Sequence, residues 1–219
     1  MRILISLCLA LALVACGNNQ TTDENTKTQG KRVVPAVEEA TIVAAEDDGW
    51  RSHGRTYSEQ RHSPLTTVNA ENVNQLGLAW SHELGADRGI EVTPIVHDGI
   101  MFVTSTWNIV TALDATSGEV LWRFDPAVDK AQASLGCCDA VNRGVAIWGD
   151  DVFTGTIDGR LISLDAATGE VNWDVSTIDT TKPYTITGAP RVVKGKVLIG
   201  NGGAELGARL CECLRCANW

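Results

Sequence analysis

The chain has 219 residues, a formal net charge of −9 and a hydrophobic fraction of 44%, which is enough apolar material for a folded core. Its 18 Lys and Arg residues stand against 27 Asp and Glu residues and form no basic run, so the composition argues against nucleic-acid binding. Two counts are unusual. Trp occurs 7 times against 3 Phe and 2 Tyr, and the 7 cysteines are an uneven number for a disulfide framework.

The first residues have the pattern of a secretion signal. Met1-Arg2 is a short positive start, and the apolar run 3–15 is too short to cross a bilayer but suits a secretory signal peptide. Residues 13–17 read Leu-Val-Ala-Cys-Gly, which resembles a bacterial lipoprotein cleavage site, where the cysteine carries the lipid. We therefore predict a lipoprotein-type signal peptide over residues 1–16 and lipidation of Cys16. An ordinary signal peptide with an incidental cysteine is the alternative.

The segment that follows differs from the rest of the chain in composition. Residues 17–48 are rich in Asn, Gln, Thr, Glu and Lys and show no apolar periodicity, so we predict a flexible tether. The expected location is the periplasm, with a lipid anchor in a bacterial membrane. In that compartment a disulfide can persist.

A repeat organises the body of the chain. Residues 112–122 read Ala-Leu-Asp-Ala-Thr-Ser-Gly-Glu-Val-Leu-Trp, and residues 163–173 read Ser-Leu-Asp-Ala-Ala-Thr-Gly-Glu-Val-Asn-Trp, an offset of 51 residues. The strands predicted in the first copy are 92–96, 101–104, 109–113 and 120–124. Those in the second copy are 144–148, 152–156, 161–164 and 171–175. Turns with Gly and Asp join them.

Four-stranded units that repeat at about 40–50 residues are typical of a β-propeller. The predicted fold class is therefore all-β, a partial β-propeller made of its first blades. The Trp that ends each repeat is expected to pack between neighbouring blades. This packing role explains much of the Trp excess.

A third copy begins with predicted strands 189–193 and 196–200 and then breaks. The repeat predicts an Asp at position 216, but residues 210–219 read Leu-Cys-Glu-Cys-Leu-Arg-Cys-Ala-Asn-Trp. The cysteines suggest a metal knuckle, yet no second Cys or His pair lies at zinc spacing. Codons can be chosen for residues 209–219 that restore the repeat when read one base later. We interpret 210–219 as a frameshifted tail, which resequencing of the DNA tests.

Cys137 and Cys138 are adjacent in the sequence. Neighbouring Cα atoms lie about 3.8 Å apart across a trans peptide, below the usual range for a disulfide. Taken alone, the pair is either a strained disulfide with a special purpose or two free thiols in a loop. The histidines show no ligand spacing and are assigned no role; they are His53, His62, His82 and His97.

Five runs resemble the quinoprotein alcohol dehydrogenases, which use pyrroloquinoline quinone (PQQ). The runs are 50–64, 88–94 (Arg-Gly-Ile-Glu-Val-Thr-Pro), 136–144 (Gly-Cys-Cys-Asp-Ala-Val-Asn-Arg-Gly), 187–190 (Thr-Gly-Ala-Pro) and 200–209 (Gly-Asn-Gly-Gly-Ala-Glu-Leu-Gly-Ala-Arg). The pattern is that of the soluble ethanol and quinohaemoprotein enzymes. The resemblance implies that residues 49–209 are the N-terminal part of an eight-bladed propeller.

The resemblance also implies PQQ and calcium as cofactors. A vicinal disulfide between Cys137 and Cys138 would stack on one face of PQQ, and Arg143 would pair with a PQQ carboxylate, which suits a guanidinium. The implied cofactor-binding residues are Glu91, Cys137, Cys138, Arg143, Thr187, Gly203 and Ala204. Glu205 is the implied ligand of Ca²⁺, which prefers hard oxygen donors. Each residue alone also has an ordinary structural reading, such as a surface ion pair for Arg143.

The implied reaction is the oxidation of primary alcohols to aldehydes by hydride transfer to PQQ, with electrons passed to a cytochrome c or a quinone. Whether a haem c domain follows stays open. The family's catalytic Asp base comes from later blades, beyond residue 219. We therefore expect no catalytic residue here, and a chain that is unstable or aggregates and is inactive as written.

Two alternatives carry the same repeat. One is a non-catalytic propeller lipoprotein that acts as a scaffold for outer-membrane assembly, and the other is a pseudoenzyme that binds PQQ without turnover. A scaffold has no reason to keep Arg143 with the cysteine pair and the run 203–205. This set favours the dehydrogenase lineage.

Overall fold

Consecutive strands of the chain pair with one another and form antiparallel sheets. The computed structural model describes residues 32–44, 49–136 and 139–202, and the backbone of 211–215. Its first sheet contains β1 (Ile95–His97), β2 (Ile100–Thr104), β3 (Val110–Asp114) and β4 (Val120–Phe124). The second contains β5 (Ala146–Trp148), β6 (Asp151–Gly155), β7 (Arg160–Asp165) and β8 (Val171–Ser176), and the third β9 (Arg191–Val193), β10 (Lys196–Gly200) and β11 (Cys211–Arg215).

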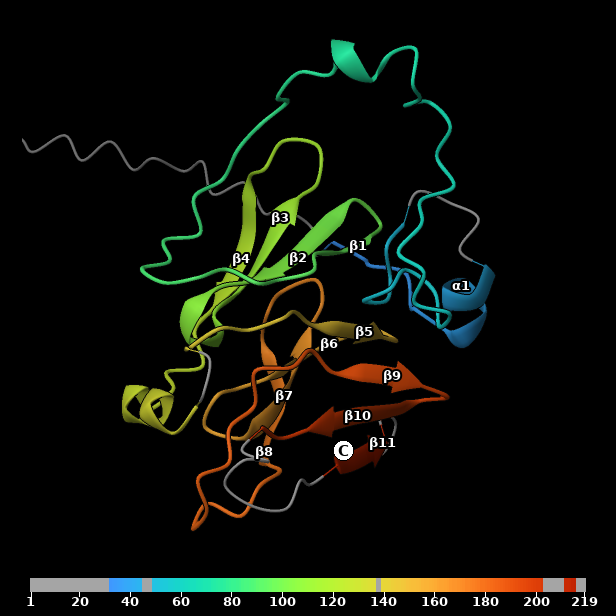
Figure 1. Ribbon diagram of the computed structural model, residues 1–219. Coiled ribbons are helices and arrows are strands. Elements are labelled where there is room, and N and C mark those ends of the chain that lie inside the picture. Colours follow the sequence, from blue (N-terminus) through green and yellow to red (C-terminus); the bar gives the residue numbers. More distant parts are fainter. Residues whose placement is uncertain (1–31, 45–48, 137–138, 203–210, 216–219) are drawn as a thin grey trace, which may run out of the picture. The chain divides into compact units, whose positions relative to one another are not determined.

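Every strand predicted from the repeat is present, but the first strand of each copy begins later than predicted (Figure 1). In the first and third copies the residues that were predicted in the strand but lie outside it include Pro94 and Pro190. A proline has no backbone N–H to donate to a neighbouring strand. In the second copy Gly144 has φ 126°, outside the strand region. The two copies also share an irregularity in strand pairing: the register shifts at Ala112/Leu113 between β3 and β4, and at Ser163/Leu164 between β7 and β8.

Alternate residues of the second sheet enter two separate hydrophobic clusters. Val152 and Ile162 pack in the same cluster as Phe102 of β2, whereas Phe153 and Leu161 pack in a different cluster that contains residues of β9 and β10. Successive side chains of a strand point to opposite faces. The second sheet is therefore covered on both faces, as expected for a blade with neighbours on either side.

The repeated Trp packs between sheets, as the sequence predicts. Trp122 at the end of the first repeat donates its Nε1–H to the Ala166 carbonyl of the second sheet at 3.0 Å. Its ring lies against Gly169, where a Cβ would be 2.6 Å from the ring. Trp80, which lies before the first predicted repeat, makes the same contact one sheet earlier: it donates to Ala115 at 3.2 Å and covers Gly118.

The prediction of a flexible tether over residues 17–48 is wrong for residues 32–44. Val37 pairs with Gly149 through two backbone hydrogen bonds, and α1 (Glu39–Ala44) follows it. Val34, Val37 and Ile42 are buried in the cluster between the first two sheets. The segment also contains the exposed Val33 and Val43, so the spacing of its apolar residues does not tell which of them fill gaps in the core. The predicted signal peptide lies outside the described residues.

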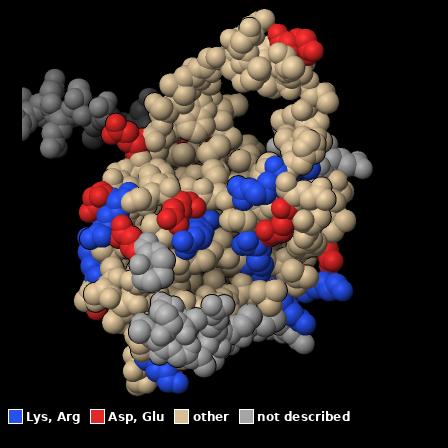
Figure 2. Space-filling view, in the orientation of Figure 1, with Lys and Arg blue, Asp and Glu red and all other residues tan. Residues whose placement is uncertain are grey.

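The remaining elements are short. They are the 3₁₀ turns η1 (Val73–Gln75), η2 (Thr106–Asn108) and η3 (Lys130–Leu135). Strand β11 lies within the segment interpreted as a frameshifted tail and pairs with β10, Gly200 opposite Cys211. No helix among the described residues is long and apolar enough to span a membrane. On the face shown in Figure 2, acidic and basic side chains lie beside one another.

Candidate functional site

Three of the residues predicted to bind a cofactor lie together. The Arg143 guanidinium forms an ion pair through Nη2 with Glu91 Oε2 at 2.7 Å, and its Nη1 donates to Thr187 Oγ1 at 2.7 Å. Glu91 precedes β1, Arg143 precedes β5 and Thr187 precedes β9. The three side chains therefore come from the same place in three successive repeats.

Backbone hydrogen bonds hold the three segments side by side. Thr93 N–H donates to the Arg143 carbonyl at 3.2 Å, and Arg143 N–H donates to the Thr187 carbonyl at 3.1 Å. Gly144 allows this approach, because a Cβ there would lie 2.9 Å from the Thr93 carbonyl oxygen. The side chain of Asn142 adds support, since it donates to the Gly155 carbonyl and accepts from Gly144 N–H.

The cluster is open to a ligand. The side chains of Arg143 and Glu91 are 37% and 46% exposed, so their charged groups are accessible. Thr187 Oγ1 accepts a hydrogen bond from Arg143, which leaves its O–H free to donate elsewhere. The cluster thus offers one cation, one hydroxyl donor and one carboxylate to a polar molecule.

The other predicted site residues lie outside the described part of the chain: Cys137, Cys138, Gly203, Ala204 and Glu205. The described residues next to them meet at Thr185. Gly202 N–H donates to the Thr185 carbonyl at 2.6 Å, and a Cβ on Gly136 would lie 3.7 Å from Thr185 Oγ1. Residues 136 and 202 therefore both lie beside the segment before β9 that carries Thr187. Among the described residues, no group of three or more His, Cys, Asp or Glu side chains is placed to hold a metal ion.

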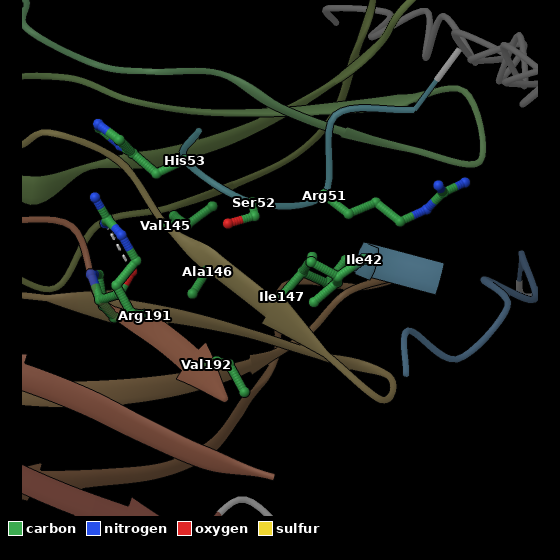
Figure 3. A pocket seen from close by; sticks show the side chains of 10 residues that line it. Ile42, Arg51, Ser52, His53, Val145, Ala146, Ile147, Arg191 and Val192 are labelled. Carbon is green, nitrogen blue, oxygen red and sulfur yellow. Dashed lines mark hydrogen bonds between the residues drawn. The ribbon is translucent and has the colours of Figure 1, made fainter. Parts of the chain in front are cut away.

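A small pocket, shown in Figure 3, lies between α1, the segment after it, β5 and β9. It is lined by Ile42, Ser52 and His53 among others and encloses about 10 Å³, room for a single water molecule. Burial, followed by the charge of Arg191, lowers the pKa of His53 there. This pocket is a packing junction and is too small for an organic ligand.

Comparison with known proteins decides the family. The model of the family described as "PQQ: Glucose/ethanol/alcohol dehydrogenase, beta-propeller domain" matches residues 50–205. The chain belongs to this family. It is 54% identical to the quinohemoprotein alcohol dehydrogenase ADH IIB of Pseudomonas putida over 208 residues, which are 94% of this chain and 28% of that protein. It is also 54% identical to the 1-butanol dehydrogenase (cytochrome c) of Thauera butanivorans, over 73% of this chain and 23% of the relative.

A solved structure of this PQQ family has the same fold. The quinohemoprotein alcohol dehydrogenase ADHIIG of Pseudomonas putida HK5 superposes with a TM-score of 0.82 and 52% identity, over 84% of this chain and 28% of that one. The predicted all-β class and partial β-propeller are thereby confirmed. The chain spans about a quarter of the length of the curated relatives it matches.

The described residues fit the cofactor for which the PQQ family is named. PQQ carries three carboxylates and an ortho-quinone, and a guanidinium with a neighbouring hydroxyl binds a carboxylate well. Arg143 and Thr187 supply these two groups on adjacent segments. For calcium, the chain's predicted ligand, Glu205, lies outside the described residues.

Sequence reasoning assigned no role to four side chains beside this site. Arg88, Trp107, Lys130 and Asp139 line a groove of about 600 Å³. Arg88 and Asp139 stand in two of the runs that resemble the family, so their positions carried a signal. No feature of the sequence indicated that the two residues pair, because they are far apart in the sequence and come together only through the arrangement of the sheets.

Proposed function

We propose that this chain is the cofactor-binding N-terminal part of a PQQ- and calcium-dependent dehydrogenase that oxidises primary alcohols to aldehydes. The observation that carries the proposal is the Arg143 guanidinium held between Glu91 and Thr187 in a chain of the PQQ family. When bound, PQQ supplies a quinone that accepts a hydride from the alcohol. Arg143 binds a PQQ carboxylate, and the Thr187 hydroxyl donates to a second acceptor on the same cofactor.

Residues outside the described part of the chain complete this proposal. Cys137 and Cys138 form a vicinal disulfide against one face of PQQ, Gly203 and Ala204 bring the backbone close to it, and Glu205 supplies one oxygen ligand to Ca²⁺. The chain spans about a quarter of the length of its relatives, and we propose that the catalytic base comes from the part that it does not span. On this proposal the 219-residue chain alone is expected to be inactive.

The location and the electron acceptor are also proposed. The N-terminal pattern supports a periplasmic protein with a lipid on Cys16, which the mass of the mature N-terminus tests. A cytochrome c or a quinone receives the electrons; the name of the Thauera relative, 1-butanol dehydrogenase (cytochrome c), supports the cytochrome. Membership of the PQQ family favours the dehydrogenase over the scaffold lipoprotein.

The test is a titration with PQQ in the presence of Ca²⁺, followed by quenching of Trp fluorescence. It uses the 219-residue chain and a chimera in which residues 50–205 replace the matching segment of the Pseudomonas putida ADH IIB. We expect the chimera to bind PQQ and to reduce a dye in the presence of alcohol, and the chain alone to reduce none. Arg143→Gln should weaken PQQ binding at least about tenfold, since a charged hydrogen-bonding partner of a carboxylate is lost.

Arg123→Gln, which removes an exposed arginine from β4, is the control and should bind like the wild type. If Arg143→Gln and Arg123→Gln bind PQQ equally well, the assignment of the site is wrong. If the 219-residue chain reduces dye with alcohol, the proposal that the base lies beyond residue 219 is wrong.

A further inference from the structure

Two ion pairs of opposite polarity join the same two segments of the chain. Glu91 pairs with Arg143 at 2.7 Å, and three residues before Glu91, Arg88 Nη1 pairs with Asp139 Oδ1 at 2.5 Å. The first segment therefore contributes one acid and one base, and so does the second. Two residues after Glu91, the Thr93 amide also joins the segments by donating to the Arg143 carbonyl.

Asp139 is held in place by its own backbone as well as by Arg88. Its φ is 76°, in the left-handed region that Asp and Asn enter more readily than other non-glycine residues. Its Oδ1 accepts from Ala140 N–H at 2.8 Å, and this hydrogen bond, followed by that from Arg88, lowers the pKa of the carboxyl. Asp139 directly follows Cys138 in the sequence.

Arg88 is fixed from a second side. Its guanidinium lies over the Trp107 ring, 5.6 Å from the centroid, and Lys130 Nζ lies 5.0 Å from the same centroid. Trp107 in turn donates its backbone N–H to the Ala140 carbonyl at 3.4 Å. Trp107 and Asp139 both have positive φ, which persists only where surrounding contacts hold it. Arg88, Trp107 and residues 139–140 thus form one connected unit.

The two ion pairs differ in what a ligand does to them. Arg143 is the group that a carboxylate ligand would contact, and the ligand would share its guanidinium with Glu91. Arg88 and Asp139 are bound to each other and to the Trp107 unit, outside the Glu91–Arg143–Thr187 cluster. The Arg88–Asp139 pair is therefore a charged connection between the segments that a ligand on Arg143 does not contact.

We propose that Arg88 and Asp139 are positioning residues of the cofactor site, whose ion pair keeps the segments of Glu91 and Arg143 in register while Arg143 binds a carboxylate of PQQ. The inference rests on the proposed function for the identity of the ligand. It predicts an effect on PQQ affinity and on the backbone between the segments, rather than on the stability of the whole fold.

The variants are Arg88→Gln and Asp139→Asn. Asn keeps the preference for positive φ and an oxygen for Ala140 N–H, so Asp139→Asn removes the charge alone. Each variant should raise the Kd for PQQ about tenfold, the low end of the range for residues that orient a ligand-binding group. The double variant should be no weaker than either single one, because both changes break one interaction. Arg88→Lys, which keeps the charge, should recover part of the affinity.

The control is Glu59→Gln. Glu59 pairs with Arg191 at 2.8 Å, with side-chain exposures of 43% and 35%, close to the 37% and 47% of Asp139 and Arg88. Its removal should leave the Kd for PQQ unchanged. All variants are compared in the 219-residue chain and in the chimera, by PQQ titration and by thermal unfolding.

A second measurement needs no cofactor. The Thr93 amide should exchange its hydrogen faster in Arg88→Gln and Asp139→Asn than in the wild type, and at the wild-type rate in Glu59→Gln. If Arg88→Gln and Asp139→Asn leave both the PQQ Kd and Thr93 exchange unchanged, or if the double variant adds the two losses, the positioning role is wrong. If the wild-type chimera binds no PQQ at all, the proposed function fails, and Thr93 exchange alone then decides whether the pair holds the segments together.

Discussion

Trp122 and Trp80 make the same contact in different surroundings. Each donates its indole N–H to a carbonyl in a turn of the following sheet, Ala166 and Ala115 respectively, and each covers a glycine of that turn. Yet the side chain of Trp122 is buried with 8% exposure, whereas Trp80 is only partly buried. The local contact is therefore independent of how deeply the ring is buried.

The difference lies in the segment that carries each Trp. Trp122 belongs to β4, the last strand of a four-stranded sheet. Trp80 lies in residues 76–84, which belong to no described strand, and Leu76 and Leu78 beside it are 63% and 84% exposed. The turn alone specifies where the indole lies, and a complete sheet is needed to bury it.

The largest expected effect comes from Gly169→Ala. Its φ is +74°, and a Cβ would lie 2.6 Å from the buried Trp122 ring, which has no room to move. We expect a loss of about 2–4 kcal/mol in the free energy of unfolding, from left-handed strain and overpacking together. Urea unfolding of the chimera measures it. A loss below about 1 kcal/mol would show that the Trp122 contact adapts.

Gly118→Ala tests the same contact at Trp80. The backbone strain is similar, with φ +75°, but the partly buried ring of Trp80 can move away from the new methyl group. The expected loss is about 1–2 kcal/mol, the cost of the left-handed backbone alone. The same urea titration applies. An effect as large as that of Gly169→Ala would mean that Trp80 is held as firmly as Trp122.

The smallest effect concerns how the stability contributed by the turn at residues 114–118 depends on pH. Hydrogen bonds from the Thr116 hydroxyl, and then from Ser117 N–H, lower the pKa of Asp114 from 3.8 to about 2. Because the folded-state pKa is lowered, the ionised carboxylate stabilises the fold above pH 3.8, and this contribution is lost as the pH falls through about 2. Asp114→Asn should therefore lose less stability than the wild type between these pH values. Unfolding midpoints at pH 5, 3.5 and 2 measure this, and parallel curves would contradict it.

The fold was largely predictable because it repeats. The residues of a turn such as 114–118 stabilise that turn by themselves. The Asp114 carboxylate accepts hydrogen bonds from the N–H groups of Thr116 and Ser117, and Gly118 takes the positive φ that closes the turn. The same pattern at Asp165 marks the second sheet. The core role of Val34, Val37 and Ile42 could not be predicted, because it depends on gaps that only the assembled sheets create.

The contacts among the predicted site residues could not be read from the sequence. The sequence by itself determined the strands and the Trp contacts, since turns and strand alternation are local properties of the chain. Glu91, Arg143 and Thr187 were chosen because their runs resemble the PQQ family. Only the tertiary structure decided that Arg143 lies between Glu91 and Thr187, and that Arg88 and Asp139 form a second ion pair across the same segments. Such pairs join residues about 50 apart, and their distance is determined by how successive sheets stack, which no local pattern encodes.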